Sequence, residues 1–170
     1  MSIRAISIGL GAAALLATTA NASDLSRMQP TVDYGSAFNF DGFYLGATAG
    51  GLLGSTSAGS VGVVAGSNFS LTNAFIGGLE FQGDAIYNGG TTYDFLTLGR
   101  LGVVLTDNIM LYGDAGAGWV AGNGSYALGG GAEFALTNAF SVRGEILGLA
   151  NWGSGLNTAK ATAGILYHFQ

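Results

Sequence analysis

Apolar side chains alternate with small or polar ones along most of this chain, and this pattern constrains its fold more than any other feature. From Phe140 to Trp152, one set of alternate positions carries aromatic, aliphatic or glycine residues, whereas Arg143 and Glu145 belong to the other set. A period of two places successive side chains on opposite faces of a β-strand. One face suits lipid and the other holds the charges, which is typical of a transmembrane β-strand. The segment 126–136 alternates in the same way.

Composition also favours a membrane as the environment of the apolar face. Charged residues make up 9% of the 170 residues, whereas about a quarter of the residues of a soluble domain are charged. Membrane-spanning helices are the alternative, because residues 42–79 carry no charge. Glycines are frequent in this window, however, and each glycine inside a helix costs about 1 kcal/mol relative to alanine. The one proline, Pro30, precedes the whole region, so proline interrupts no later strand.

The N-terminal residues have the pattern of a secretory signal peptide. Arg4 supplies the positive charge, residues 5–20 form the apolar run, and Ala20 and Ala22 are the small residues of a cleavage site. An uncleaved anchor is the alternative, but the run is short for a span and no positive cluster follows it. The predicted organisation is a cleaved signal peptide (1–22), a periplasmic lead-in (23–40) and an outer-membrane β-barrel domain (41–170).

A repeated turn motif sets the number of strands. The pattern Leu-Thr-Asn/Asp-x-apolar occurs at 71–75 and 136–140, and a related form occurs at 105–109. The interval between motifs fits one outer loop and two strands of membrane length, each of about 9–11 residues. Clusters of Gly and Asn mark four loops, at 54–60, 88–92, 122–125 and 153–157. Strands are predicted at 42–53, 61–71, 74–87, 93–105, 109–121, 126–136, 140–152 and 158–169. The predicted fold is therefore an all-β, eight-stranded, antiparallel up-and-down transmembrane barrel with both termini in the periplasm.

Two segments resemble parts of a known family. Residues 38–46, Phe-Asn-Phe-Asp-Gly-Phe-Tyr-Leu-Gly, are similar to the first strand of OmpA-like and opacity-type (porin-family) outer-membrane barrels. Thr162, Gly164, Tyr167 and Phe169 resemble the assembly signal of that family, although Gln170 follows the final aromatic residue. The resemblance implies location in the cell outer membrane of a Gram-negative bacterium. It also implies contact with outer-membrane lipid and lipopolysaccharide, and with periplasmic chaperones and the barrel-assembly machinery.

Several other chemistries are disfavoured by the sequence. The chain has no Cys and a formal charge of −5, which exclude thiol chemistry and argue against nucleic acid as a partner. The glycine-rich segment 113–118 has no helix to follow it, as a phosphate-binding turn would require. His168, the only histidine, is predicted to lie at the periplasmic rim rather than in a hydrolase site. No spacing of His and carboxylates suggests a metal site, so neither an enzyme activity nor a cofactor is predicted.

Charged residues of the barrel domain fall into two predicted layers inside the lumen. Counting from the turns places six of them at similar heights: Glu80, Arg100, Asp114, Glu133, Arg143 and Glu145. We expect Glu80 to lie opposite Arg100 and Glu133 opposite Arg143 on neighbouring strands. A second, looser layer is expected from Asp84, Asp94 and Lys160. An arginine facing lipid at mid-membrane would cost about 2–4 kcal/mol, so these side chains are predicted to point inward.

Two functions fit this arrangement. The favoured one is a non-enzymatic outer-membrane protein that contributes to envelope structure and surface properties, with its lumen plugged by charged side chains. The alternative is a narrow channel or a barrel that binds a small solute. An eight-stranded barrel has room only for its own side chains or for one small ligand. The many glycines predicted to face the lumen, such as Gly62, Gly66, Gly116 and Gly118, keep the second function open.

Overall fold

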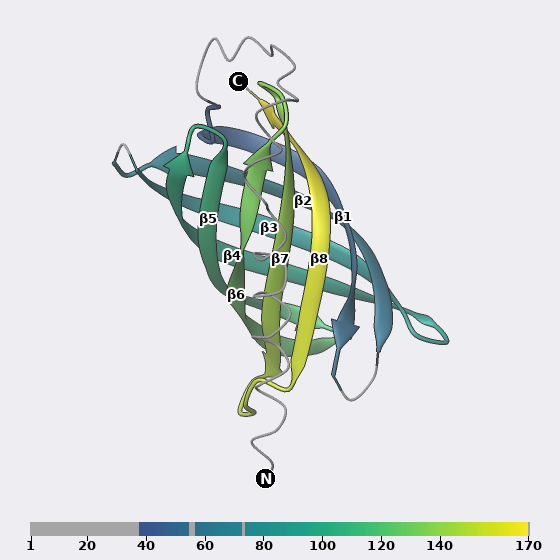
Figure 1. Cartoon of the computed structure of the whole chain (residues 1–170). Helices are drawn as coiled ribbons and strands as arrows, with labels where there is room; N and C mark the ends of the chain where they lie inside the picture. Colours follow the sequence, from purple (N-terminus) through teal and green to yellow (C-terminus); the bar gives the residue numbers. More distant parts are fainter. Residues whose placement is uncertain (1–37, 55–56, 73, 170) are drawn as a thin grey trace, which may run out of the picture. The chain divides into compact units, whose positions relative to one another are not determined.

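The strands of this protein close into a single β-barrel. The computed structural model describes residues 38–54, 57–72 and 74–169. Within them, each strand pairs antiparallel with its neighbours in sequence, and β1 also pairs with β8, so the sheet has no free edge (Figure 1). The strands are β1 (Gly42–Leu53), β2 (Ala58–Ser70), β3 (Phe75–Tyr87), β4 (Thr91–Thr106), β5 (Ile109–Val120), β6 (Asn123–Ala135), β7 (Phe140–Asn151) and β8 (Thr158–Phe169). The predicted eight-stranded up-and-down topology is confirmed.

Part of the predicted organisation falls outside the described residues. This applies to the signal peptide 1–22, with Ala20 and Ala22 at its cleavage site, and to residues 23–37 of the lead-in. In the described part of the chain there is no helix that is long and apolar enough to cross a membrane.

The exposure of side chains follows the predicted alternation. In β4, Leu96, Leu98 and Arg100 are almost completely buried in the lumen, whereas Phe95 and Leu101 are each 58% exposed on the outer face. Closure of the sheet satisfies the backbone hydrogen bonds, as a hydrocarbon environment demands. The outer face can therefore be covered by lipid, while the inner face can carry charge.

One end of the barrel, called the turn end below, carries the start of β1, the end of β8 and the three predicted tight turns. Two of these turns use the same hydrogen bonds. Leu71 N–H donates to Phe75 O at 2.8 Å, and Leu136 N–H donates to Phe140 O at 2.8 Å. In both, the threonine hydroxyl accepts the backbone N–H of the final aromatic residue. The third turn, between β4 and β5, differs because the strand register shifts near Val104.

The opposite end, called the loop end, is more strand-like than the sequence indicated. β6 begins at Asn123 rather than 126, so the predicted loop 122–125 is wrong. The connection from β5 to β6 consists of Ala121 and Gly122, whose φ angles are 49° and 80°. Positive φ at both central residues is the geometry of a type I′ turn, which matches the twist of paired strands. The Asp94 carboxylate accepts the Ala121 N–H at 2.9 Å, a tertiary contact that sequence spacing does not reveal.

Glycines on the inner face let the strands approach closely and leave room for large side chains. A Cβ at Gly116 or Gly118 would collide with carbonyl oxygens of β4. At Gly62 the space is occupied by the Asp84 carboxylate, and at Gly66 by the Tyr44 ring. These glycines therefore accommodate the protein's own side chains, rather than leaving free space for a solute at those positions.

Residues 38–40 close the lumen at the turn end. Phe38 N–H donates to Asp107 O at 3.1 Å, and the Asn68 amide donates to Phe40 O at 3.0 Å. Both phenylalanine rings are buried, and the Phe38 ring lies 4.9 Å from the His168 ring, centroid to centroid. The last residues of the predicted lead-in thus form an aromatic stopper of the barrel.

Candidate functional site

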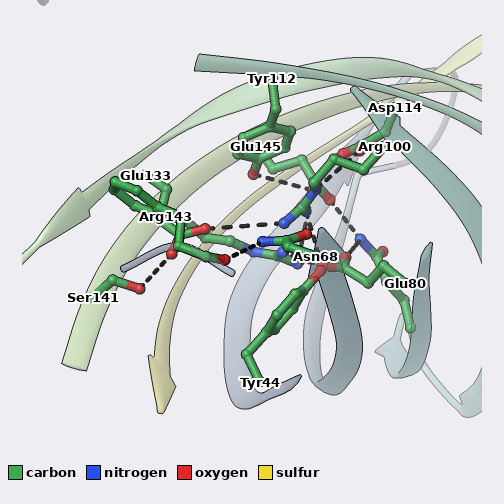
Figure 2. Close-up of polar contacts among 12 residues, drawn as sticks. Tyr44, Asn68, Glu80, Arg100, Tyr112, Asp114, Glu133, Ser141, Arg143 and Glu145 are labelled. Atoms are coloured by element: carbon green, nitrogen blue, oxygen red, sulfur yellow. Dashed lines mark hydrogen bonds and ion pairs between the residues drawn. The ribbon is translucent and has the colours of Figure 1, made fainter. Parts of the chain in front are cut away.

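Two arginines and four carboxylates meet in the lumen in what we call the lower layer. Arg143, on β7, reaches across the barrel to Glu80 on β3 (Figure 2). Its two terminal nitrogens lie 2.5 and 2.9 Å from the two oxygens of Glu80, which is a bidentate pair. Tyr44 OH also donates to Glu80, at 2.5 Å. Charge-assisted, bidentate contacts of this kind fix orientation as well as contributing energy.

Arg100 joins the remaining carboxylates of the lower layer to this pair. Its Nη2 lies 2.8 Å from Glu80 Oε2 and 3.6 Å from Glu145 Oε2. Its Nε donates to Asp114 Oδ1 at 3.2 Å. The guanidinium carbon lies 3.9 Å from the centroid of the Tyr112 ring, which provides a cation–π contact. The charged side chains of Arg100, Glu80, Asp114 and Glu145 are almost wholly buried inside the barrel.

Glu133, the fourth carboxylate of the lower layer, forms a buried cluster with Ser141 and His168. The geometry of this cluster is not that of a catalytic triad. Ser141 Oγ donates to Glu133 Oε1 at 2.7 Å, and His168 Nε2 lies 2.8 Å from the same oxygen and 3.1 Å from Ser141 Oγ. In a triad the acid orients the other ring nitrogen of the histidine. Here the acid and the serine share Nε2, and Nδ1 has no hydrogen-bond partner in the described residues. His168 lies at the turn end of β8 and on the face opposite to Tyr167 and Phe169, as predicted, and it is 1% exposed.

The upper layer lies nearer the loop end and contains Asp84, Asp94 and Lys160. Lys160 forms an ion pair with Asp84 and donates to Gln82 Oε1 at 3.1 Å. Gln82 links the two layers, because its amide nitrogen donates to Glu80 at 2.8 Å and to Glu145 at 2.7 Å. Asp94 is 1% exposed, and its Oδ2 has no hydrogen-bond partner among the described residues.

The structure brings all six residues of the predicted lower layer together. Of the two predicted cross-strand alignments, Glu133 opposite Arg143 is confirmed and Glu80 opposite Arg100 is wrong. The strand register aligns Arg100 with Gly78 and Asp114 rather than with Glu80. Glu133 is directly opposite Arg143 in the register, yet Arg143 pairs with Glu80 instead. Pairing across the lumen is possible because an arginine side chain is long enough to span a narrow barrel. The sequence prediction considered only residues on adjacent strands and therefore did not include this pairing.

Sequence reasoning did not identify the uncharged members of the network, Tyr44, Gln82, Tyr112 and Ser141. Gln82, Tyr112 and Ser141 lie in the same alternate sets as the charges of their strands. β1 carries no charge, and Tyr44 lies in the alternate set of Gly46 and Gly50. Parity is therefore the signal that could have found all four residues. No group of three His, Cys, Asp or Glu side chains in the described ranges is arranged to hold a metal ion.

The residues of the predicted assembly signal divide between the two faces of β8. Tyr167 and Phe169 are 41% and 53% exposed on the outer face, with ring centroids 5.0 Å apart. Thr162 is buried opposite Glu145, and Gly164 is aligned with Arg143. The two aromatic residues of the predicted signal therefore belong to the exposed outer face, and Thr162 and Gly164 belong to the inner face.

The chain was compared with family models, curated proteins and solved structures. No family model matches the chain, and no curated protein matches its sequence. Among solved structures, a designed transmembrane β-barrel aligns with a TM-score of 0.52 and 16% identity, over 78% of this chain and 99% of that one. The outer-membrane protein Ail of Yersinia pestis aligns with a TM-score of 0.50 and 13% identity, over 74% of this chain and 99% of that one. The chain has the fold of a small outer-membrane β-barrel. The N-terminal β-barrel domain of OprF from Pseudomonas aeruginosa agrees, with a TM-score of 0.50 and 13% identity over 74% of this chain and 97% of that one.

The outer face of this small barrel is the surface expected for the fold. Large apolar side chains such as Phe43, Val63 and Phe81 are 58–70% exposed there. Every Lys and Arg in the described ranges, by contrast, is buried in the lumen. The candidate functional site of the barrel is therefore internal, and it consists of the two linked charged layers.

Proposed function

We infer that this chain is a non-enzymatic protein of the cell outer membrane whose role is structural, with a lumen plugged by the lower layer. The observation that carries this proposal is the bidentate contact of Arg143 with Glu80 from the opposite wall, to which Arg100 adds a second cation. A solute or ion that crosses the barrel has to break these contacts. Separating such a buried pair is costly because it leaves a charge uncompensated in a poorly solvated space.

The proposal includes an orientation. A secretory signal peptide would deliver the chain to the periplasm, and short turns of outer-membrane barrels face that side. The turn end, with the aromatic stopper of Phe38 and Phe40, then faces the periplasm, and the loop end faces outward. Periplasmic chaperones and the barrel-assembly machinery would insert the chain in this orientation, using the outward aromatic residues Tyr167 and Phe169.

Contact with lipid and lipopolysaccharide would be predominantly apolar. The three basic side chains of the described residues, Arg100, Arg143 and Lys160, are buried in the lumen. None of them is available to bind the phosphate groups of a lipid surface. The outer belt of aromatic and aliphatic side chains would instead pack against acyl chains, which supports a role in envelope structure.

Ion conductance in a planar lipid bilayer tests the plug. The unaltered protein is expected to give no large, steady channel. The double variant Arg100→Ala, Arg143→Ala is expected to conduct, because it removes both guanidinium groups that span the lumen. Asp107→Asn is the control, since this carboxylate is exposed at the turn end. Large porin-like channels in the unaltered protein would contradict the plug and would favour the channel alternative.

Binding of a small solute is the second candidate function, and one feature favours it. A cavity of about 430 Å³ lies at the loop end, with lining residues from strands on several sides of the barrel. It opens on the side of the barrel away from the aromatic stopper, so a solute would enter and leave through the same mouth.

A further inference from the structure

We propose that the cavity at the loop end is a binding site for a small organic ammonium ion, with the Asp94 carboxylate as the group that recognises its charge. This proposal is independent of the proposed plug. A barrel that does not conduct ions could bind an ammonium ion at the loop end or fail to bind it, so the two proposals can be tested separately. The argument rests on the place of the cavity, the charge beneath it and two buried polar atoms, Asp94 Oδ2 and Ser60 Oγ, that lack a hydrogen-bond partner in the described residues.

The upper layer lies directly beneath the cavity. Ile86, Thr92 and Thr158 line the cavity, and each lies two residues toward the loop end from a member of the upper layer on the same strand. Side chains two residues apart on a strand share a face. Asp84, Asp94 and Lys160 therefore occupy the next level inward. The Asp94 carboxylate is tied to the cavity wall as well, because it accepts the backbone N–H of Ala121, which lines the cavity.

The charges of this level do not balance. Asp84 and Asp94 are directly opposite each other in the strand register, and like charges so placed repel. Lys160 forms its ion pair with Asp84. Asp94 keeps one oxygen, Oδ2, that is buried and lacks a hydrogen-bond partner in the described residues. A buried carboxylate oxygen without a partner is unfavourable, so a cation that binds here removes an existing penalty.

The Ser60 hydroxyl is a second buried polar group without a hydrogen-bond partner in the described residues. Ser60 is 3% exposed. The register aligns Ser60 with Ile86, which places it at the level of the cavity wall. A hydroxyl can accept a hydrogen bond from a ligand N–H. An ammonium group has several N–H donors, so it can meet more than one acceptor of this kind.

The residues that line the cavity indicate which kind of organic group can accompany the ammonium. Leu52, Ile86 and Val120 provide apolar surface, and Thr92 and Thr158 provide hydroxyl groups. The volume of about 430 Å³ falls within the range of about 300–1,000 Å³ that is usual for sites of small molecules. A short aliphatic or aromatic body attached to one ammonium group fits this combination better than a bare metal ion.

The loop-end connections add no charge to that of Asp84, Asp94 and Lys160 in the upper layer. The connections of the loop end, at 54–57, 88–90, 121–122 and 152–157, contain no Asp, Glu, Lys or Arg. An approaching cation meets no positive charge at the mouth. Low-dielectric walls around one sign of charge concentrate its field, so an ammonium ion is favoured over an anion of the same shape.

Three probes of matched shape test the site: phenethylammonium, phenethyl alcohol and phenylacetate. Each would be titrated into the refolded barrel in lipid nanodiscs, with the amide NMR signals of Gly90 and Ala121 as the readout. Phenethylammonium is expected to shift these signals in a saturable manner, and the other two probes are not. Asp94→Asn is expected to weaken binding by about tenfold or more, which corresponds to about 1.4 kcal/mol.

Two matched variants distinguish a loss of binding from a loss of folding. Asp94→Asn is nearly isosteric, and an unchanged spectrum away from the loop end will show that the barrel still folds. Asp107→Asn, at the turn end, is expected to bind phenethylammonium as the unaltered protein does. Saturation by phenethyl alcohol at equal strength, saturation by potassium chloride alone, or unchanged binding in Asp94→Asn would overturn the proposal.

Discussion

Arg143 forms its ion pair with a residue across the lumen rather than with the residue directly opposite it on the neighbouring strand. Glu133 is directly opposite in the register, but Arg143 pairs with Glu80 on another wall. The Glu133 carboxylate is engaged by Ser141 and His168 instead. A bidentate contact with Glu80 satisfies both carboxylate oxygens, which a contact from the adjacent strand does not offer here.

Substitution of Arg143 tests the contribution of this pair to stability. Arg143→Met keeps the length of the side chain but leaves Glu80 with one fewer cation, so the free energy of unfolding is expected to fall by about 3–5 kcal/mol. Adding Glu80→Gln to this variant is expected to restore part of the loss. Urea titration in lipid vesicles, followed by tryptophan fluorescence, measures both changes.

The exposed carboxylate of Asp107 provides the reference for this comparison. Asp107→Asn is expected to change the free energy of unfolding by no more than about 0.5 kcal/mol. If Arg143→Met were as stable as Asp107→Asn, the pair with Glu80 would contribute nothing and the explanation of the network would be wrong.

At the scale of the strands, glycine decides where neighbouring strands can approach each other. Gly118 on β5 faces β4 so closely that an added Cβ would collide with the Phe95 carbonyl oxygen. Gly144 on β7 has nothing within 4 Å of the place where its Cβ would be. The two positions therefore have the same residue for different reasons.

A pair of matched substitutions distinguishes these reasons. Gly118→Ala is expected to destabilise the barrel by about 1–3 kcal/mol, as other overpacked sites do, because β4 and β5 have to move apart. Gly144→Ala is expected to be neutral or slightly stabilising, since alanine also restricts the unfolded chain. The same urea titration measures both variants, and equal effects would show that the close approach at Gly118 does not matter.

The elements also show what the sequence could and could not supply. The number of strands and the face on which each side chain lies were predictable, because the Leu-Thr turns and the period-two pattern are local signals. The start of β6 at Asn123 was not predictable, since the Ala121–Gly122 turn is supported by Asp94, a residue that is distant in sequence. The pairing of Arg143 with Glu80 also depends on the width of the closed barrel, and no local pattern encodes that width.

At the scale of the whole molecule, closure between β1 and β8 makes the fold resistant to partial opening. Their register extends from Phe43 paired with Phe169 to Leu53 paired with Ala159. Opening this seam exposes backbone hydrogen-bonding groups on both strands, and in lipid each such group costs several kcal/mol. The barrel is therefore expected to open cooperatively rather than strand by strand.

Electrophoresis tests this property. An unboiled sample in dodecyl sulfate is expected to migrate differently from a boiled one, because the closed barrel stays folded until it is heated. Deleting residues 158–170, which include β8, removes the seam and serves as the control that should show one mobility. Identical migration of the intact protein before and after boiling would argue against a closed barrel.

The burial of the basic residues has a consequence for digestion of the folded protein. Proteases of the trypsin class cut only after lysine or arginine, and their active sites need several residues of extended, accessible chain. Arg100, Arg143 and Lys160 lie within paired strands, with their side chains enclosed by the barrel wall. The same inward placement that keeps charge away from lipid therefore removes every described cleavage site of this enzyme class from its reach.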